Sequence, residues 1–532
     1  MTEVEHGAKG GQEDNGPSLA KRLEEGRSTG SGNRSRAGSP SSSSQDVPST
    51  SSPPTPPSQS SEKQPRQDPN LVDWHGSDDP ENPKNWSPAK KWLTMVIIST
   101  CSFCVTLNSS IVTSTFDYIS TDFGISREVA ILGLSLFVAG LGLGPLLLGP
   151  ASEVFGRKPI YIVALTSFWL FQFPVAFANN APVFMIFRFL CGLTGSAFLS
   201  VSGGTVADLY SPNDLFTPMC FYSASPFLGP SFGPLIGNFI STYTRWNWCF
   251  WTTIIWTFCQ LLAVAFLSPE TYAPKLLTLR ARKLRKETGN EKLYSQQEQA
   301  VKDMDFKRQM VMFITRVPML LALEPMLLLL CIWSALLLGI LYLLFEAFPI
   351  VFEQQHGFTA PQTGLAFLGQ SVGIVFAYMT IPYWSKVYRR AAARNGGQAP
   401  PEARLPMCMV GSFLTPVGLF IFAFTSYSHV HWIAPIIALV PFGAGVLFIY
   451  TGVFTYTTTA WLPVAASAMS ANSLLRSAWA GAFPLFATQM YNGLGTVGAS
   501  ALLAGVNVLM IPIPFVLYRY GPAIRARSKY TL

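Results

Sequence analysis

Charged side chains are scarce in this sequence: Asp, Glu, Lys and Arg make up only 12 % of its 532 residues. A soluble protein of this length usually carries about twice that fraction. Hydrophobic residues reach 49 %, and the mean hydropathy is +0.30. This balance excludes an ordinary cytosolic enzyme, a disulfide-stapled secreted protein and a coiled coil. It predicts a protein with several membrane-spanning segments.

Signatures of several chemical classes are also missing. The eight cysteines lack the spacing of metal ligands, and each lies in or beside an apolar segment. We therefore expect buried thiols, with no disulfide and no metal site. There is no G-x-x-x-x-G-K-[ST] loop, which argues against an ATP-driven pump. Because no nucleophile–base pair stands out, the sequence predicts neither an enzyme nor a cofactor.

The start of the chain differs in composition from the rest. Residues 1–70 are rich in Ser, Pro, Gly and Gln, and such a stretch buries too little apolar surface to offset the entropy lost on folding. We expect a disordered cytoplasmic tail over residues 1–90. A cleavable signal peptide is not expected, because no apolar stretch lies near the start.

Apolar runs of about 18–25 residues recur after the tail, each long enough to cross a ~30 Å hydrocarbon core. Because backbone amides in lipid must be paired within the segment, these runs predict helices. Twelve can be placed, near residues 92–114, 129–149, 159–178, 183–206, 217–241, 248–267, 325–348, 362–382, 406–426, 432–456, 465–490 and 497–518.

The positive charges predict the orientation of these spans. With the amino terminus in the cytoplasm, the outer loops hold only Arg127 and Arg245, and two arginines lie within spans. The other Lys and Arg residues all fall on the inner side. Both termini are therefore expected in the cytoplasm. The net charge of +8 is a signal of topology and not of nucleic-acid binding.

The long connection at 268–317 divides the spans into six and six. We expect a first six-helix bundle at 91–267, this cytoplasmic loop, a second bundle at 318–520 and a cytoplasmic tail at 521–532. Within the loop, Leu276–Lys286 is basic and amphipathic at helical spacing. It fits either a helix on the inner leaflet or a solvated linker helix.

The loop after the second span reads Gly149-Pro150-Ala151-Ser152-Glu153-Val154-Phe155-Gly156-Arg157-Lys158. Glycines permit a tight turn and a close helix approach. The loop resembles the signature of the major facilitator superfamily, G-x-x-x-D-x-x-G-R-K, with Glu in place of Asp. The resemblance implies a cytoplasmic gate, at which we expect Glu153 and Arg157 to form a charge cluster, with Asp208 as a candidate third member.

Two further segments resemble motifs of the same superfamily. Arg188-Phe189-Leu190-Cys191-Gly192 is similar to its second motif, with Cys191 in place of Gln. The segment that contains Gly229, Gly233, Pro234 and Gly237 resembles the antiporter motif G-x-x-x-G-P-x-x-G-G, with Asn238 in place of the last Gly. Small residues allow tight helix packing, and proline bends the helix. In the superfamily this motif accompanies exporters.

Three more segments resemble the fungal twelve-span drug:proton antiporter branch, which includes multidrug, polyamine and metabolite exporters. They are Asp79–Trp86, Pro269–Pro274 and Leu341–Pro349, and the resemblance extends over about 78–525. It implies the major facilitator fold, an all-α membrane protein of two six-helix bundles.

Ionisable residues at membrane depth are energetically expensive and therefore candidates for a substrate or proton pathway. They are Asp117, Arg188, Glu346 and Arg476. The resemblance places the first and fourth helices beside one cavity, so we expect Asp117 to pair with Arg188. Glu346 could carry a proton or contact substrate. Arg476 either lines the cavity or reaches the inner headgroups, and Glu324 is expected to cap a helix.

The expected function is proton-coupled export of a small molecule, first of all a secondary metabolite or a drug, by alternating access in the fungal plasma membrane. The two membrane arginines leave an organic acid or an acidic glycolipid as an alternative cargo. A polyamine would want more buried carboxylates. The antiporter motif opposes a nutrient symporter, and a non-transporting receptor is a further alternative. Expected partners are the substrate, protons and the lipid bilayer, and the chain is expected to be monomeric.

Overall fold

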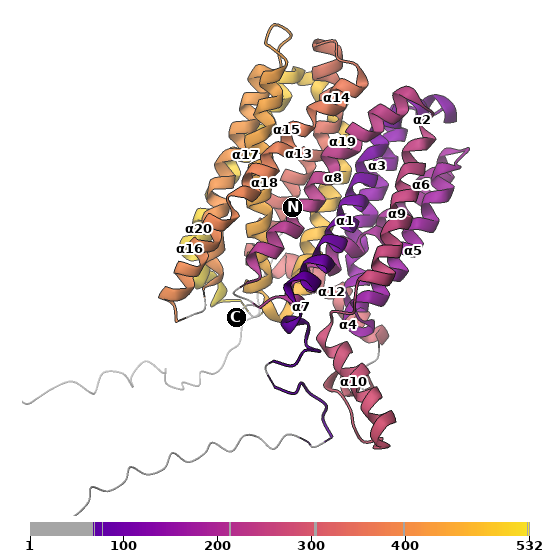
Figure 1. The fold of residues 1–532 in the computed structure, drawn as a ribbon. Coiled ribbons are helices and arrows are strands. Elements are labelled where there is room, and N and C mark those ends of the chain that lie inside the picture. The colour runs from indigo at the N-terminus through magenta and orange to yellow at the C-terminus, as the bar shows by residue number, and fades with distance from the viewer. Residues whose placement is uncertain are drawn as a thin grey trace, which may run out of the picture. The chain divides into compact units, whose positions relative to one another are not determined.

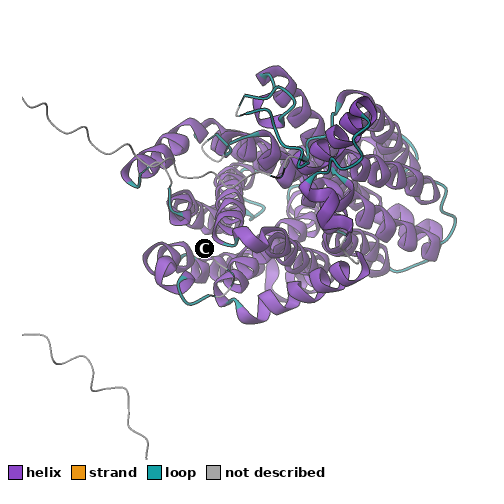
Figure 2. Ribbon diagram, turned by 90° about the horizontal axis from the view of Figure 1, so that it is seen from below, coloured by secondary structure: helices purple, strands orange, loops and turns teal. Residues whose placement is uncertain are grey.

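A computed structural model describes residues 68, 70–76, 78–211, 214–302, 306–396, 399–528 and 530 of the chain. Of the disordered tail predicted over residues 1–90, residues 1–67 lie outside this part, whereas its end is described and includes a short helix at Pro83–Asn85. Within the described part the secondary structure is helical, apart from an isolated bridge between Leu71 and Tyr294 (Figure 2).

Nine α-helices of the described residues precede the long central connection. They are α1 (Pro88–Ile111), α2 (Phe116–Phe123), α3 (Arg127–Leu143), α4 (Pro145–Phe155), α5 (Arg157–Ala176), α6 (Ala181–Gly195), α7 (Ala197–Leu209), α8 (Phe216–Tyr243) and α9 (Asn247–Leu267), with the short helices η1 (Pro83–Asn85) and η2 (Val112–Thr115). Side-chain caps fix two of the starts. Ser126 accepts a hydrogen bond from the Val129 amide, and Asn180 accepts one from the Val183 amide.

The central connection and the second half of the chain are helical as well. They contain α10 (Ala273–Thr288), α11 (Gln296–Lys302), α12 (Phe306–Leu323), α13 (Pro325–Phe348), α14 (Ala360–Ala366), α15 (Leu368–Met379), α16 (Ile381–Arg394), α17 (Leu405–Thr425), α18 (Ile433–Ala460), α19 (Ala465–Met510) and α20 (Pro512–Arg525), with the short helices η3 (Pro349–Gln355), η4 (Pro401–Arg404) and η5 (Leu462–Val464). Glu324 immediately precedes α13, but its side chain forms no cap hydrogen bond there and accepts one from Ser528 instead.

Nine helical stretches in the described residues are long and apolar enough to cross a membrane, or ten if the bent pair Ala360–Met379 and Ile381–Arg394 is one span. The sequence predicts twelve, and two features account for the difference. The helix α8, which contains four prolines, is not among these stretches. The last stretch, Ala465–Arg525, includes two predicted spans, and Gly495 breaks it with φ 71° and ψ 164°.

Helices from the same half of the chain pack closely on one another (Figure 1). In the first half, α1 packs on α8, α3 on α6, and α5 on α6 and α9. In the second half, α13 packs on α19, and α18 on α15 and α17. Contacts between the halves come from α3 with α19 and from α8 with α14 and α15. One of them is a hydrogen bond of 2.6 Å from Ser135 to the Gly481 carbonyl.

Large apolar side chains lie exposed on the outside of the helices, among them Val163, Phe266 and Leu509. This is the pattern expected where lipid is the solvent. Seven of the eight cysteines are buried as predicted, but the prediction is wrong for Cys259, which is exposed on α9.

Candidate functional site

Arg188 is almost completely buried in α6, at 1 % exposure. Its Nη1 donates to the carbonyl and side-chain oxygens of Asn108, at 3.0 and 2.9 Å, and Nη2 donates to the Ser109 carbonyl at 3.2 Å. Its Nε donates to the Gly133 carbonyl at 3.2 Å, and the guanidinium lies 4.3 Å from the Phe137 ring centroid. These neutral groups fix one charged side chain between α1, α3 and α6.

The predicted pair between Arg188 and Asp117 is wrong. The side chain of Asp117 is 78 % exposed and forms an ion pair with Arg127 at the start of α3. The residues of the first span that bind Arg188 are Asn108 and Ser109. They precede Asp117 by eight or more residues, which is roughly 12 Å of helix rise. Asp117 therefore lies further along the chain, toward Arg127, than the residues that bind Arg188.

Arg127 also reaches the second half of the chain. Its Nη2 lies 3.3 Å from Oε2 of Glu346 on α13. The Glu346 side chain is 3 % exposed, and its other oxygen, Oε1, is buried with no hydrogen-bond partner among the described residues. A second polar contact joins the halves nearby, between Ser109 Oγ and Tyr342 Oη at 2.8 Å. Arg127 and Glu346 thus form a charged link between the two halves.

The antiporter-like motif on α8 packs against α1. Gly229, Gly233 and Gly237 recur at intervals of four and face Thr106 and Ser110 on α1 and Ser114 on η2, which recur at the same interval. A Cβ atom at Gly233 would lie only 2.8 Å from the Ile111 backbone nitrogen. Pro234 lies inside the helix. The predicted tight packing is confirmed, because side chains at these glycines would push α1 and α8 apart.

The signature loop between α4 and α5 is held by two acids. The Nε of Arg157 lies 3.1 Å from Oδ2 of Asp208 on α7, as predicted, and Nη1 donates to Ser152 Oγ at 2.6 Å. The second acid is Glu270, whose carboxylate accepts the backbone N–H groups of Arg157 and Lys158 at 3.0 and 3.1 Å. It thereby caps the start of α5, where a helix favours negative charge.

Gly156 allows this capping arrangement. It has φ 97°, and a Cβ atom there would lie 2.6 Å from Oε2 of Glu270. A larger residue would therefore strain the backbone and displace the carboxylate. Lys158 takes part through its backbone amide, and Gly149 on α4 lies close to the Phe313 ring.

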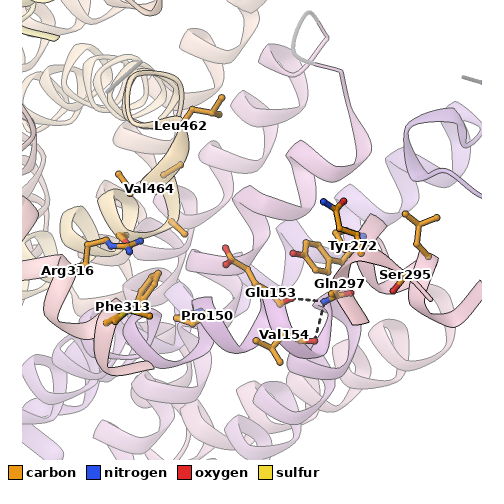
Figure 3. A pocket seen from close by; sticks show the side chains of 17 residues that line it. Pro150, Glu153, Val154, Tyr272, Ser295, Gln297, Phe313, Arg316, Leu462 and Val464 are labelled. Atoms are coloured by element: carbon orange, nitrogen blue, oxygen red, sulfur yellow. Dashed lines mark hydrogen bonds between the residues drawn. The ribbon is translucent and has the colours of Figure 1, made fainter. Parts of the chain in front are cut away.

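The expected pair between Glu153 and Arg157 is not found in the described residues. The Arg157 guanidinium already donates hydrogen bonds to Asp208 and Ser152. Glu153 instead lines a cavity of about 670 Å³ between α4, α10, α11, α12 and the start of α19 (Figure 3). Its carbonyl oxygen accepts a hydrogen bond of 3.0 Å from Gln297, while its carboxylate and Arg316 lie at separate walls of the cavity.

Arg476 lies on α19 beside two aromatic rings of α18. Its guanidinium is 5.7 Å from the Tyr450 ring centroid and 5.4 Å from that of Phe454. Within the described part of the chain it forms no hydrogen bond or ion pair, and its Nε is buried without a partner. Both rings are buried, and the Arg476 side chain beside them is partly buried.

A segment before α1 is joined to α10 outside the spans. Asp79 accepts backbone N–H groups from His75 and Glu81, both at 2.9 Å, and Nη1 of Arg280 lies 2.6 Å from its Oδ2. The Arg280 bond and the two backbone bonds lower the pKa of Asp79 to about 2. Arg285 pairs with Glu298. These two arginines of the basic helix are therefore engaged by protein acids.

Comparison with known families identifies the chain. The family model described as Major Facilitator Superfamily matches residues 98–521. The chain belongs to the major facilitator superfamily. As a member of this transporter superfamily it is not an enzyme.

Relatives in the superfamily match most of the chain. The "Efflux pump atB" of Aspergillus terreus is 41 % identical over 86 % of this chain and 90 % of its own length. The "Probable drug/proton antiporter YHK8" of Saccharomyces cerevisiae is 41 % identical over 85 % of this chain and 88 % of its own. The xylose transporter XylE from E. coli, solved in a partially occluded inward-open conformation, matches with a TM-score of 0.58 at 16 % identity, over 81 % of this chain and 98 % of its own. That similarity confirms the major facilitator fold.

Sequence reasoning about this major facilitator missed two charged residues. Glu270 lies in the segment Pro269–Pro274, which contributed to the resemblance but received no role of its own. Arg127 entered only as one of the few outer charges. A signal for it was present, since an arginine at an outer helix start lies on the same side as Asp117 and Glu346.

Proposed function

We propose that this chain is a proton-coupled exporter of a small molecule, first of all a secondary metabolite or a drug. Relatives about 40 % identical over most of the chain carry the names efflux pump and drug/proton antiporter. The close packing of α8 on α1 fits the antiporter motif. The observation that carries the proposal is the ion pair between Arg127 and Glu346, because it couples a buried carboxylate to the contact between the two halves.

The architecture we propose has twelve spans in two six-helix bundles, at 91–267 and 318–520, with both termini in the cytoplasm and a single chain in the plasma membrane. The break at Gly495 supports two spans within Ala465–Arg525. A continuous helix of that length would measure about 90 Å, roughly three times the hydrocarbon thickness. The concentration of Lys and Arg on one side supports the orientation.

In the proposed cycle Glu346 carries the proton. A buried carboxylate is stable as an anion only beside a positive charge, here Arg127. Protonation from the outer side removes the charge of Glu346 and weakens the link between the halves, so that they part on that side and release the cargo. When the halves close again, Arg127 favours the ionised form, and the proton leaves toward the inside.

The other predicted residues take supporting roles in this proposal. Arg157 and Asp208, with Glu270, hold the cytoplasmic gate, in which Gly149, Gly156 and Lys158 shape the loop. Arg188 is a positioning residue, since its four hydrogen bonds hold α1, α3 and α6 together next to the Ser109–Tyr342 contact. Asp117 is the exposed second partner of Arg127.

The experiment that tests the function compares metabolites in the culture medium of the native host, with the gene deleted and with it overexpressed. We expect at least one compound that falls on deletion and rises on overexpression. A drug-sensitivity panel on the same strains covers foreign compounds. If neither the medium nor drug resistance changes in either strain, export is contradicted.

A further inference from the structure

Arg476 has no acidic partner among the described residues of its own half of the chain. After residue 353 the only Asp or Glu is Glu402. That carboxylate is bound by Arg525, at 2.9 and 3.0 Å. The carboxylate of Glu346 faces Arg127. A cation in the interior of a membrane protein is costly unless something compensates it, and the two aromatic rings supply only part of that compensation.

Arg188 provides the contrast that singles out Arg476. Every nitrogen of the Arg188 guanidinium donates a hydrogen bond to a protein oxygen. Arg476 donates none to the residues that the structure describes, and its side chain is only partly buried. The protein itself therefore supplies an acceptor to each guanidinium nitrogen of Arg188, whereas the hydrogen-bonding capacity of Arg476 is available to a ligand.

The surroundings of Arg476 combine aromatic faces with a free polar atom. Tyr450 packs against Phe227 of α8, with ring centroids 4.3 Å apart and ring planes inclined by 39°, so both halves of the chain contribute to this place. One turn before Arg476 on α19, Asn472 donates to Ser334 Oγ at 2.6 Å, but its Oδ1 is buried with no partner in the described part of the chain. Residues four apart share a helix face.

We propose that Arg476 binds a carboxylate group of the cargo, whose aromatic or apolar body lies against Tyr450 and Phe454. This proposal rests on the proposed function, export of a small molecule, and deepens it by naming the cargo class as apolar organic acids. A guanidinium presents a planar fork of donors that matches a carboxylate, and such charge-assisted bonds are about twice as strong as neutral ones. A bound carboxylate also neutralises an otherwise uncompensated charge.

The test measures binding of two probes, 2-naphthoate and its methyl ester, to the purified full-length protein in lipid nanodiscs by titration calorimetry. The probes share an aromatic body and differ in the negative charge. We expect the wild-type protein to bind the acid about tenfold or more tightly than the ester. R476Q should abolish this difference and leave ester binding unchanged, and R476K should retain part of it.

Arg404 supplies a matched control. It also lies over aromatic rings, 3.4 Å from the Tyr388 centroid, and its Nε and Nη1 have no hydrogen-bond partner in the described residues. R404Q should leave the preference for the acid unchanged. Equal binding of acid and ester by the wild-type protein, or an equal loss of both in R476Q, would overturn the proposal, as would no binding of either probe.

A second variant and a second readout keep the test decisive. If R476Q does not fold, R476K must weaken acid binding selectively, and an equal effect on both probes overturns the proposal. Uptake of the neutral ester into vesicles, driven by a proton gradient, reports on the proposed function without Arg476. Driven uptake of the ester without any preference for the acid would contradict the carboxylate site while leaving export intact.

Discussion

Arg127 and Glu346 lie 3.3 Å apart, Nη2 to Oε2, and they join α3 in the first half of the chain to α13 in the second. Arg127 pairs with Asp117 as well. Its two acidic partners differ sharply in exposure, at 3 % for Glu346 and 78 % for Asp117. An exposed carboxylate is solvated whether or not it is paired, whereas a buried one depends on its partner. The two acids should therefore respond differently to substitution.

Replacing Glu346 by Gln should abolish proton-driven export. The amide cannot bind or release a proton, and the charged link to Arg127 is lost. We expect uptake into inside-out vesicles with an acidic interior to fall about tenfold or more, while exchange of labelled for unlabelled cargo without a gradient persists.

Asp117→Asn is the matched control for Glu346→Gln, because it removes the exposed partner of the same arginine. It should retain most of the driven uptake. If the two variants lose activity equally, the assignment of the proton to Glu346 is wrong.

Arg188→Lys should lower the stability of the folded protein as well as its transport rate. A lysine ammonium cannot reproduce hydrogen bonds to three residues on two helices. Breaking a buried charged network costs about 3–5 kcal/mol, so the melting temperature of the purified protein should fall along with transport. An unchanged melting temperature with loss of transport would show that Arg188 contacts cargo or protons directly.

Gly233→Ala should weaken the contact between α1 and α8. The new methyl group would meet the Ile111 nitrogen at 2.8 Å and Ser110 Cβ at 2.9 Å. Overpacking of this kind costs about 1–3 kcal/mol. Gly203→Ala is the control, because the nearest atom there is Met219 Cε at 3.6 Å and alanine favours helix. Thermal unfolding of both variants measures the difference in stability. If Gly233→Ala is as stable as Gly203→Ala, the tight packing of α8 on α1 is contradicted.

The Asp79–Arg280 pair predicts a specific pH dependence of stability. The pKa of Asp79 is lowered to about 2 in the folded protein from the usual 3.8. Its stabilising effect is therefore complete above the unfolded pKa and is lost as the pH falls from about 4 toward 2. The difference in melting temperature between the wild-type protein and Asp79→Asn should shrink over that range. A difference that stays constant from pH 6 to pH 2 would contradict this.

The sequence was sufficient to predict features that depend on local spacing. The α8 glycines recur every four residues, and Arg157 follows a turn glycine. Contacts between residues that lie far apart in the chain were harder to predict from the sequence. Asp208 was predicted through the resemblance, but Asp117 was assigned to Arg188, because helix membership alone does not give depth along the helix. Glu270 caps α5 across more than a hundred residues of chain, and no periodicity reports such a contact.

The count of spans depends on how apolar each helix is along its whole length. The stretches of the described residues that are long and apolar enough to cross a membrane do not include α8, which contains four prolines together with glycines and serines, although the sequence predicts a span at 217–241. At Gly495 the backbone leaves helical geometry, between the spans predicted at 465–490 and 497–518, so the break agrees with the predicted boundary.

The most direct test of proton-driven export uses inside-out vesicles from cells that express the full-length protein. These vesicles are incubated with a total metabolite extract of the native host. Mass spectrometry then compares the vesicle contents with and without an acidic interior. If Glu346 carries the proton, at least one compound accumulates only with the gradient and only in wild-type vesicles, not in Glu346→Gln vesicles. Enrichment that survives collapse of the gradient, or equal enrichment in both kinds of vesicle, would contradict it.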